Sequence, residues 1–420
     1  MSVKFLLAAI NSKYIHMNPA VYSLRTYALG SGALNTENAE IAIVEYTINQ
    51  SMDEILGDLY ERKPDVIGFS CYIWNWQMTK ELMVEVKKLL PQTDIFLGGP
   101  EVSYEAEKIM EQYGRADEET GNGPVIRGII LGEGEKTFCE LVEYYAQRED
   151  HNLLQDIKGL LLDTGYPGVR EPLSFSEIPF LYEEQRLSGK GLQDFRNKII
   201  YYESSRGCPF RCSYCLSSID KTLRLRDVNR VLPELQFFLD CKVPQVKFID
   251  RTFNCNRAHA MAIWQYLTEH DNGVTNFHFE IAAELITEEE LELFQKMRPG
   301  LIQLEIGVQT TNPKTLKAIH RSADMTHLSQ IVERIRTGRN IHVHLDLIAG
   351  LPEEDYESFV HSFNEVYAMK PEQLQLGFLK VLKGSPMYHM TEQYGIVYQS
   401  TPPPYGSFSS PALHDSPHIP

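Results

Sequence analysis

The stretch Arg206-Gly-Cys-Pro-Phe-Arg-Cys-Ser-Tyr-Cys215 places three cysteines within eight residues, directly after a short apolar run at residues 199–203. Three thiolates this close in sequence can converge on one metal centre if the loop wraps around it, and Gly207 and Pro209 suit such a loop. Three protein ligands would leave one iron of a four-iron cluster open to an exogenous chelator. Zinc is the main alternative, although structural zinc sites use four protein ligands.

Composition supports a metal or catalytic use of these cysteines. The chain has 420 residues, 43% apolar and 23% charged, which is typical of a globular protein of about two domains. The first apolar run, residues 5–10, is too short for a signal peptide or a membrane span. We therefore expect a cytoplasmic protein with reduced thiols and no membrane partner. The net charge of −17 argues against a general nucleic-acid surface.

From residue 199 onward, apolar runs alternate with amphipathic stretches. Strands are predicted at residues 199–203, 245–250, 276–281, 301–306, 342–348 and 373–378. Six such units predict a partial (β/α)6 TIM-like barrel over residues 199–387, with its site at the carboxyl ends of the strands. Residues 388–420 are expected to form a disordered tail. The chain ends abruptly there, so we also expect that a C-terminal region covering the substrate is missing.

The N-terminal half shows the same alternation with continuous apolar strands. This predicts a Rossmann-like parallel sheet at residues 1–150 with helices on both faces, followed by a linker at 151–198. Ligands of such sheets bind beyond the carboxyl ends of the strands. The candidate residues at those ends are Ser70, Gly98, Gly99, Gly132, Glu133 and Gly134. Their glycines permit either close approach of a large flat ligand or simply tight turns.

The spacing Cys-x-x-x-Cys-x-x-Cys, with an aromatic residue before the third cysteine, resembles the signature of the radical SAM superfamily. The resemblance covers residues 199–387. It implies that Cys208, Cys212 and Cys215 hold a 4Fe–4S cluster whose fourth iron binds S-adenosylmethionine (SAM). One electron would then cleave SAM to a 5′-deoxyadenosyl radical that abstracts hydrogen from a substrate. The cofactors carry this chemistry, and an electron donor such as flavodoxin or ferredoxin is implied.

The same resemblance implies SAM contacts at Phe210, Asp250, Glu280, Gln309 and Arg321. Asp250 stands where the family often has a Gly-Gly-Glu-like stretch, and because this chain departs from it, a simple turn cap is the alternative. Glu280 is a carboxylate in an apolar strand, which is costly unless it is paired. Gln309 lies in Gly-Val-Gln-Thr, similar to the family's Gly-Val-Gln-Ser segment. Arg321 is expected to face the SAM carboxylate, with a surface helix end as the alternative.

The N-terminal sheet resembles the cobalamin-binding domain of many radical SAM enzymes. Ser70, Gly98-Gly99 and Gly132–Glu135 match places where that domain meets the corrin and its nucleotide tail. The first loop lacks the Asp-x-His-x-x-Gly motif that supplies a cobalt ligand, and His16 has the wrong spacing. Cobalamin is therefore expected to bind without a protein histidine. An empty, purely structural domain is the alternative.

Together the two resemblances predict a cobalamin-dependent radical SAM enzyme that transfers a methyl group to a carbon of a small-molecule or peptide substrate. One alternative is a radical enzyme like the tRNA methylthiotransferases. That group carries three further N-terminal cysteines, whereas only Cys71 and Cys139 occur here. The second alternative is a non-catalytic iron–sulfur or cobalamin-binding sensor, which would not cleave SAM. The sequence predicts neither the substrate nor the catalytic residues.

Overall fold

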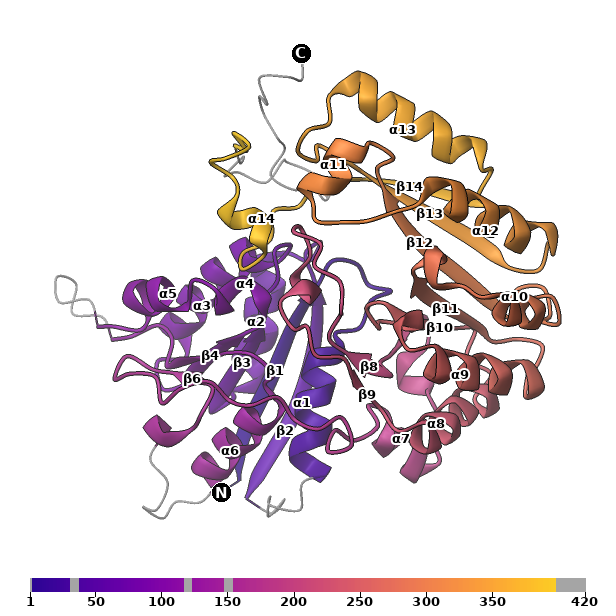
Figure 1. Ribbon diagram of the computed structural model, residues 1–420. Coiled ribbons are helices and arrows are strands. Elements are labelled where there is room, and N and C mark those ends of the chain that lie inside the picture. Colours follow the sequence, from indigo (N-terminus) through magenta and orange to yellow (C-terminus); the bar gives the residue numbers. More distant parts are fainter. Residues whose placement is uncertain (1, 31–37, 117–122, 147–153, 398–420) are drawn as a thin grey trace. The chain divides into compact units, whose positions relative to one another are not determined.

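The computed structural model describes residues 2–30, 38–116, 123–146 and 154–397, in two compact units (Figure 1). Unit 1 runs to Lys190 and includes Arg196–Lys198, whereas unit 2 contains Gly191–Phe195 and the chain from Ile199 onward. In the described ranges, no helix has the length and apolar character needed to cross a membrane. The final residues 398–420, which belong to the predicted tail, lie outside the described part.

Unit 1 is built on a six-stranded sheet of order β2-β1-β3-β4-β5-β6. Strands β1 to β5 are parallel, and β6 is antiparallel to β5. The strands are β1 (Val3–Asn11), β2 (Ala39–Thr47), β3 (Val66–Ser70), β4 (Asp94–Gly98), β5 (Gly128–Ile130) and β6 (Leu160–Leu161). The helices are α1 (Pro19–Gly30), α2 (Met52–Arg62), α3 (Trp76–Leu89), α4 (Pro100–Ser103), α5 (Ala106–Tyr113), α6 (Glu135–Ala146) and α7 (Glu183–Ser188). The predicted Rossmann-like sheet is confirmed.

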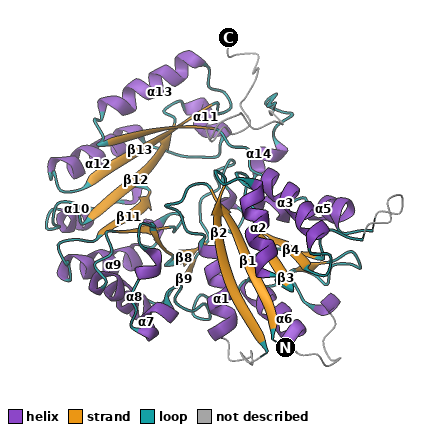
Figure 2. Ribbon diagram, turned by 180° about the vertical axis from the view of Figure 1, so that it is seen from behind, coloured by secondary structure: helices purple, strands orange, loops and turns teal. Residues whose placement is uncertain are grey.

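Strand β1 shows why the sequence folds this way. Leu6, Ala8 and Ile10 pack in one core with residues of α2, α3 and α5. Their neighbours Phe5, Leu7 and Ala9 pack in a second core with residues of α1 and α6. A strand with helices on both faces must be apolar on both faces, as β1 is from Phe5 to Ile10 (Figure 2).

The segment predicted as a linker, residues 151–198, is part of unit 1 as far as Lys190. It supplies the edge strand β6, and its Phe175 and Ile178 form a small core against Tyr27. The apolar run at residues 157–162 is consistent with a strand, and β6 lies within it. Residues 151–153 lie outside the described part.

Unit 2 contains a six-stranded parallel sheet of order β14-β13-β12-β11-β10-β7, as predicted for the partial barrel. The strands are β7 (Ile200–Tyr202), β10 (Gln245–Phe248), β11 (Asn276–Ile281), β12 (Ile302–Gln309), β13 (His342–Ala349) and β14 (Gln373–Phe378), and a separate pair is formed by β8 (Ser205–Arg206) and β9 (Arg224–Leu225). The helices are α8 (Val228–Asp240), α9 (Arg257–Glu269), α10 (Glu288–Phe294), α11 (Pro313–Ala318), α12 (Met325–Thr337), α13 (Tyr356–Ala368) and α14 (Pro386–His389).

The two faces of this sheet differ in polarity. Phe279 of β11 packs against Trp264 of α9, and that ring packs against Phe294 of α10, so the helix-covered face is apolar. The alternating residues His278 and Glu280 lie on the opposite face. Polar side chains are therefore gathered on the face away from the helices.

Candidate functional site

The cysteine motif lies in a loop that is closed by a short antiparallel ribbon. Ser205 and Arg206 of β8 pair with Leu225 and Arg224 of β9, so residues 207–223 form one loop. Gly207 has φ = +88°, and a Cβ there would lie 2.2 Å from the carbonyl oxygen of Thr222. Only glycine fits this close approach, which confirms its part in shaping the loop.

Backbone hydrogen bonds tie the loop to distant parts of unit 2. The Ser213 N–H donates to the Ile319 carbonyl at 2.9 Å, and the Met387 N–H donates to the Ser213 carbonyl at 2.8 Å. Within the loop, the Cys208 N–H donates to the Asp220 carbonyl at 3.0 Å. The motif is therefore tied to the segments that follow α11 and β14.

The three cysteines are free thiols; Cys208 and Cys212 are buried and Cys215 is half-buried. Burial raises the pKa of the Cys208 thiol, and the nearby sulfur atoms of Cys215 and Cys212 raise it further. A cationic metal centre would offset both the burial of the thiolates and the repulsion between them. Three cysteines are one ligand short of a structural zinc site, whereas a four-iron cluster held by three thiolates keeps one iron open.

Arg321 lies beside this loop. Its Nη1 is 3.8 Å from the Cys212 sulfur, and its Nη2 donates to the Gly307 carbonyl. Gln309, with φ = +71°, follows Gly307 at a shift in the β12–β13 register. In the described part, Arg321 Nε, Gln309 Oε1 and Glu284 Oε2 are buried without hydrogen-bond partners. Burying a polar atom without a hydrogen-bond partner lowers the stability of the fold. A bound ligand that carries a carboxylate and an ammonium group would supply an acceptor for Arg321 Nε and donors for the two oxygens.

Asp250 has a different environment from the one that a SAM contact requires. Its carboxylate is fully buried, and Oδ1 accepts hydrogen bonds from the Ser204 and Ser205 hydroxyls at 2.6 and 2.7 Å. Its Oδ2 accepts from the Ser204 N–H at 3.0 Å. Burial raises the pKa of Asp250 to about 6, against the effect of these hydrogen bonds. These contacts favour the structural alternative, in which Asp250 fixes the chain just before the motif.

The remaining two predicted SAM contacts lie at accessible positions. Glu280, near the end of β11, forms ion pairs with Arg251 and, at 3.6 Å, with Lys247. Its charge is therefore paired, as an apolar strand requires. Phe210, inside the cysteine loop, is 36% exposed.

In unit 1, the loops after neighbouring strands are joined by hydrogen bonds. The Asn18 side chain donates to the Ser70 hydroxyl at 3.0 Å, and the Cys71 N–H donates to the Gly98 carbonyl at 2.7 Å. Gly99 has φ = +111°, and a Cβ there would lie 2.5 Å from the Cys71 carbonyl oxygen. The fold itself therefore requires glycine at position 99. This supports the alternative that this glycine serves a tight turn, not the approach of a ligand.

The glycines after β5 differ from Gly99. Gly132 has φ = +75°, and a Cβ there would meet nothing within 4 Å. A Cβ on Gly134 would lie 3.0 Å from a methyl group of Leu24, and Glu133 between them is half-buried. Of the predicted glycines, Gly132 is therefore the one that faces open space.

Some residues that shape these sites carry no local signal in the sequence. Asn75 is buried and donates to the carbonyls of Ile10 and Ser70, which joins the ends of β1 and β3. In unit 2, the buried Arg226 forms an ion pair with Glu234 at 2.6 Å. Both become visible only when the strands are placed side by side.

Two family models match the chain over these same regions. Residues 202–366 match the radical SAM superfamily, and residues 10–142 match the B12 binding domain. The chain is a radical SAM protein with a B12-binding domain. Its radical SAM domain implies a 4Fe–4S cluster and SAM as cofactors, and its B12-binding domain implies cobalamin.

Relatives of this radical SAM protein share both regions. It is 25% identical over 359 residues to the cobalamin-dependent radical SAM methyltransferase TokK of Streptomyces tokunonensis, covering 80% of this chain and 50% of the relative. It is 23% identical over 369 residues to the hopanoid C-3 methylase of Methylococcus capsulatus, covering 82% of this chain and 65% of the relative. The chain thus spans about half to two thirds of the length of these relatives.

A solved structure shows the same fold. The radical SAM methyltransferase TsrM from Kitasatospora setae, with cobalamin and a 4Fe–4S cluster bound, superposes with a TM-score of 0.70 at 17% identity. The match covers 95% of this chain and 76% of TsrM. The arrangement of a Rossmann-like domain before a partial barrel is therefore shared.

Proposed function

We propose that this radical SAM protein is a cobalamin-dependent methyltransferase that methylates a carbon atom of a small-molecule or peptide substrate. The observation that carries the proposal is the pairing of a B12-binding domain with a radical SAM domain in one chain. TokK and the hopanoid C-3 methylase, which match across about four fifths of this chain, are named for methyl transfer.

The residues of unit 2 have separate parts in this proposal. Cys208, Cys212 and Cys215 hold the cluster, and with three protein ligands one iron stays open for SAM. Arg321 supplies positive charge beside Cys212 for the SAM carboxylate, and Gln309 offers an unpaired amide oxygen to the same ligand. When bound, the cluster and SAM supply the organic radical, and cobalamin supplies the methyl group.

The residues of unit 1 would form the cobalamin surface. Ser70, Gly98 and Gly132 lie at or just beyond the ends of β3, β4 and β5, the edge where parallel sheets bind ligands. The open space next to Gly132 leaves room for close approach of a flat ring. The carbonyl of His16 accepts hydrogen bonds from Asn11 and Lys198, so this residue anchors its loop through the backbone.

Partners and compartment follow from the same chemistry. A low-potential electron donor of the flavodoxin or ferredoxin class would reduce the cluster. Reduced thiols and such donors fit the cytoplasm. A B12-binding match over residues 10–142 also favours this function over a tRNA methylthiotransferase, which carries further cysteines in that region.

The test uses the full chain, anaerobically reconstituted with iron, sulfide and cobalamin. We expect about four irons per chain. With reductant and SAM labelled on its methyl group, labelled methylcobalamin and 5′-deoxyadenosine should form. The variant with Cys208, Cys212 and Cys215 replaced by Ala should lose the iron and the 5′-deoxyadenosine, whereas Cys241→Ala should keep both. Binding of cofactors without any SAM cleavage would contradict the proposal and favour a sensor.

A further inference from the structure

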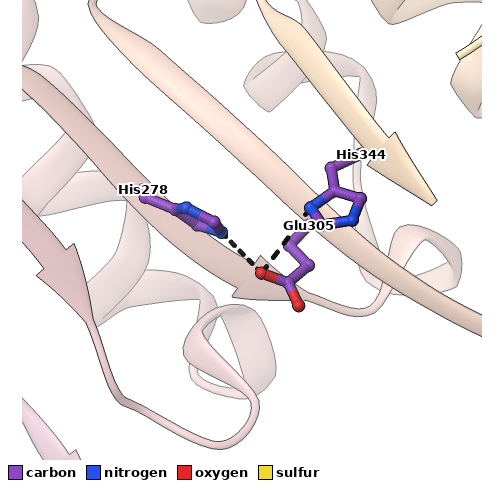
Figure 3. Close-up of side chains that lie close together, drawn as sticks. All are labelled: His278, Glu305 and His344. Carbon is purple, nitrogen blue, oxygen red and sulfur yellow. Dashed lines mark hydrogen bonds and ion pairs between the residues drawn. The ribbon is translucent and has the colours of Figure 1, made fainter. Parts of the chain in front are cut away.

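A group of two histidines and one glutamate lies on three adjacent strands of unit 2 (Figure 3). His278 is on β11, Glu305 on β12 and His344 on β13, and one ligand atom from each lies within 4.8 Å of the others. The register brings them together, because Glu305 is the direct partner of His344 and lies two residues beyond the partner of His278. All three lie on the face of the sheet away from the helices.

The contacts in this group centre on one oxygen atom. Glu305 Oε2 lies 2.7 Å from His278 Nε2 and 3.8 Å from His344 Nδ1. Both histidines are buried. Within the described part of the chain, neither ring nitrogen of His344, Nδ1 or Nε2, forms a well-aligned hydrogen bond. Buried polar atoms without partners point to a missing ligand.

A further carboxylate lies behind His344. Asp346 Oδ1 is 3.0 Å from Nε2, the ring nitrogen that faces away from Glu305. Histidines that bind a metal through one nitrogen almost always donate the other N–H to a carboxylate, carbonyl or water. Asp346 lies within reach of His344 Nε2 for such a contact but forms no well-aligned hydrogen bond with it, and Nδ1 is left to face Glu305.

The charged side chains around the group carry an excess of negative charge, which favours a bound cation. Lys247 Nζ lies 3.2 Å from Glu305 Oε2 and 3.6 Å from Glu280 Oε1, and Arg251 also pairs with Glu280. Three carboxylates, those of Glu280, Glu305 and Asp346, thus face two cationic side chains. Lys247 will weaken metal binding by repulsion, so the affinity should be lower than in a site without it.

We propose that His278 Nε2, Glu305 Oε2 and His344 Nδ1 bind one divalent transition-metal ion of the zinc class. Two histidines and one carboxylate form a donor set of zinc and non-haem iron sites, which leave a position open to water or a substrate atom. His278 and Glu305 precede the strand-end residues Glu280 and Gln309 along β11 and β12. The site is distinct from the cysteine loop and does not depend on the proposed methyl transfer.

The test measures zinc on the full chain with its cluster reconstituted. Elemental analysis after dialysis should find about one zinc in addition to the cluster iron. Titration with Zn²⁺ should show at least 100-fold weaker binding for Glu305→Gln and His344→Ala, and 10- to 100-fold weaker binding for Asp346→Asn, the scale for losing the partner of a ligand. The matched control is His361→Ala on α13, whose exposed imidazole pairs only with Glu365 in a surface ion pair. It should bind zinc like the wild type.

Two further measurements separate loss of the site from loss of the fold. Zinc should raise the unfolding temperature of the wild type and of His361→Ala but not of Glu305→Gln, a near-isosteric change. X-ray absorption at the zinc edge of the wild type should show nitrogen and oxygen ligands without sulfur, and the triple cysteine variant should retain the zinc. The proposal is overturned if the wild type binds no more zinc than Glu305→Gln, or if the bound zinc shows sulfur ligands.

Discussion

At the scale of single residues, Asp250 shows how burial decides a role that sequence position leaves open. It lies just beyond β10, where a SAM contact is expected from the family, but its two carboxylate oxygens accept hydrogen bonds from Ser204 and Ser205. His259 adds a contact from its Nε2 to the Ser204 hydroxyl at 3.0 Å, and burial lowers its pKa to about 4. This network fixes the chain immediately before the ribbon that carries the cysteines.

Replacing Asp250 by Ala should therefore lower the free energy of unfolding by about 2–4 kcal/mol, because the Ser204 N–H and two hydroxyls are left buried without an acceptor. Denaturant unfolding of the full chain, followed by circular dichroism, measures this. Arg321→Ala is the comparison, since it should weaken SAM binding more than it lowers stability. Normal stability of Asp250→Ala with loss of SAM binding would restore the role of Asp250 as a SAM contact.

The pKa of Asp250 also predicts a pH dependence. Because burial raises this pKa from 3.8 to about 6, the folded state holds the proton more tightly than the unfolded state. The stabilising contribution is complete below about pH 4 and is lost as the pH rises through about 6. Asp250→Asn does not titrate, so its stability relative to the wild type should improve by about 2–3 kcal/mol between pH 4 and pH 8. A constant difference across this range would show that Asp250 is not buried as described.

At the scale of elements, the two glycines at the end of β4 differ. The fold requires glycine at position 99 but not at position 98. A Cβ on Gly99 would collide with the Cys71 carbonyl, whereas a Cβ on Gly98 would make ordinary contacts at 3.8 Å with Ile130. Adjacent glycines in the sequence thus have different tolerances. A large residue at Gly99 would disturb the β3–β4 loops before it reached any cofactor.

Gly99→Ala should lower the free energy of unfolding by at least about 2 kcal/mol, because both its positive φ and the close carbonyl oppose a side chain. Gly98→Ala should change it by less than about 1 kcal/mol. Thermal unfolding of the two variants compares them directly. At Gly132, the positive φ also opposes any side chain, so Gly132→Ala is the control for Gly132→Phe. Loss of cobalamin binding in Gly132→Phe but not in Gly132→Ala would identify Gly132 as the point of ligand approach. Equal stabilities for Gly98→Ala and Gly99→Ala would refute the assignment.

The elements that could be predicted are those whose signal is local. Strands β11 and β14 were predicted to the residue, because their apolar periodicity and turn residues lie within each segment. Strand β6 lies in the apolar run at residues 157–162, which is compatible with a strand, but its two-residue length and its place at the sheet edge follow only from pairing with β5. The group of His278, Glu305 and His344 was missed, because only the strand register brings residues so distant in sequence together.

At the scale of the whole molecule, the two units have separate cores and separate candidate sites. The proposed cobalamin surface lies in unit 1, and the three cysteines proposed as cluster ligands lie in unit 2. Replacing Cys208, Cys212 and Cys215 by Ala should therefore leave cobalamin binding intact. The bound cofactor should show the absorption spectrum of a base-off form without imidazole, and His16→Ala should leave that spectrum unchanged. Imidazole ligation that disappears in His16→Ala would contradict this prediction.

The strand order of unit 2 has a consequence for how the protein matures. Each strand from β11 to β14 lies beside the strand synthesised just before it, so this part of the sheet can grow in order as the chain leaves the ribosome. The cysteine loop is made early, but Arg321, which contacts Cys212, is made 109 residues later, and Met387 follows later still. The thiols therefore lack their final contacts through much of translation. We expect loading of the iron–sulfur cluster to be a late step that follows the synthesis of α14.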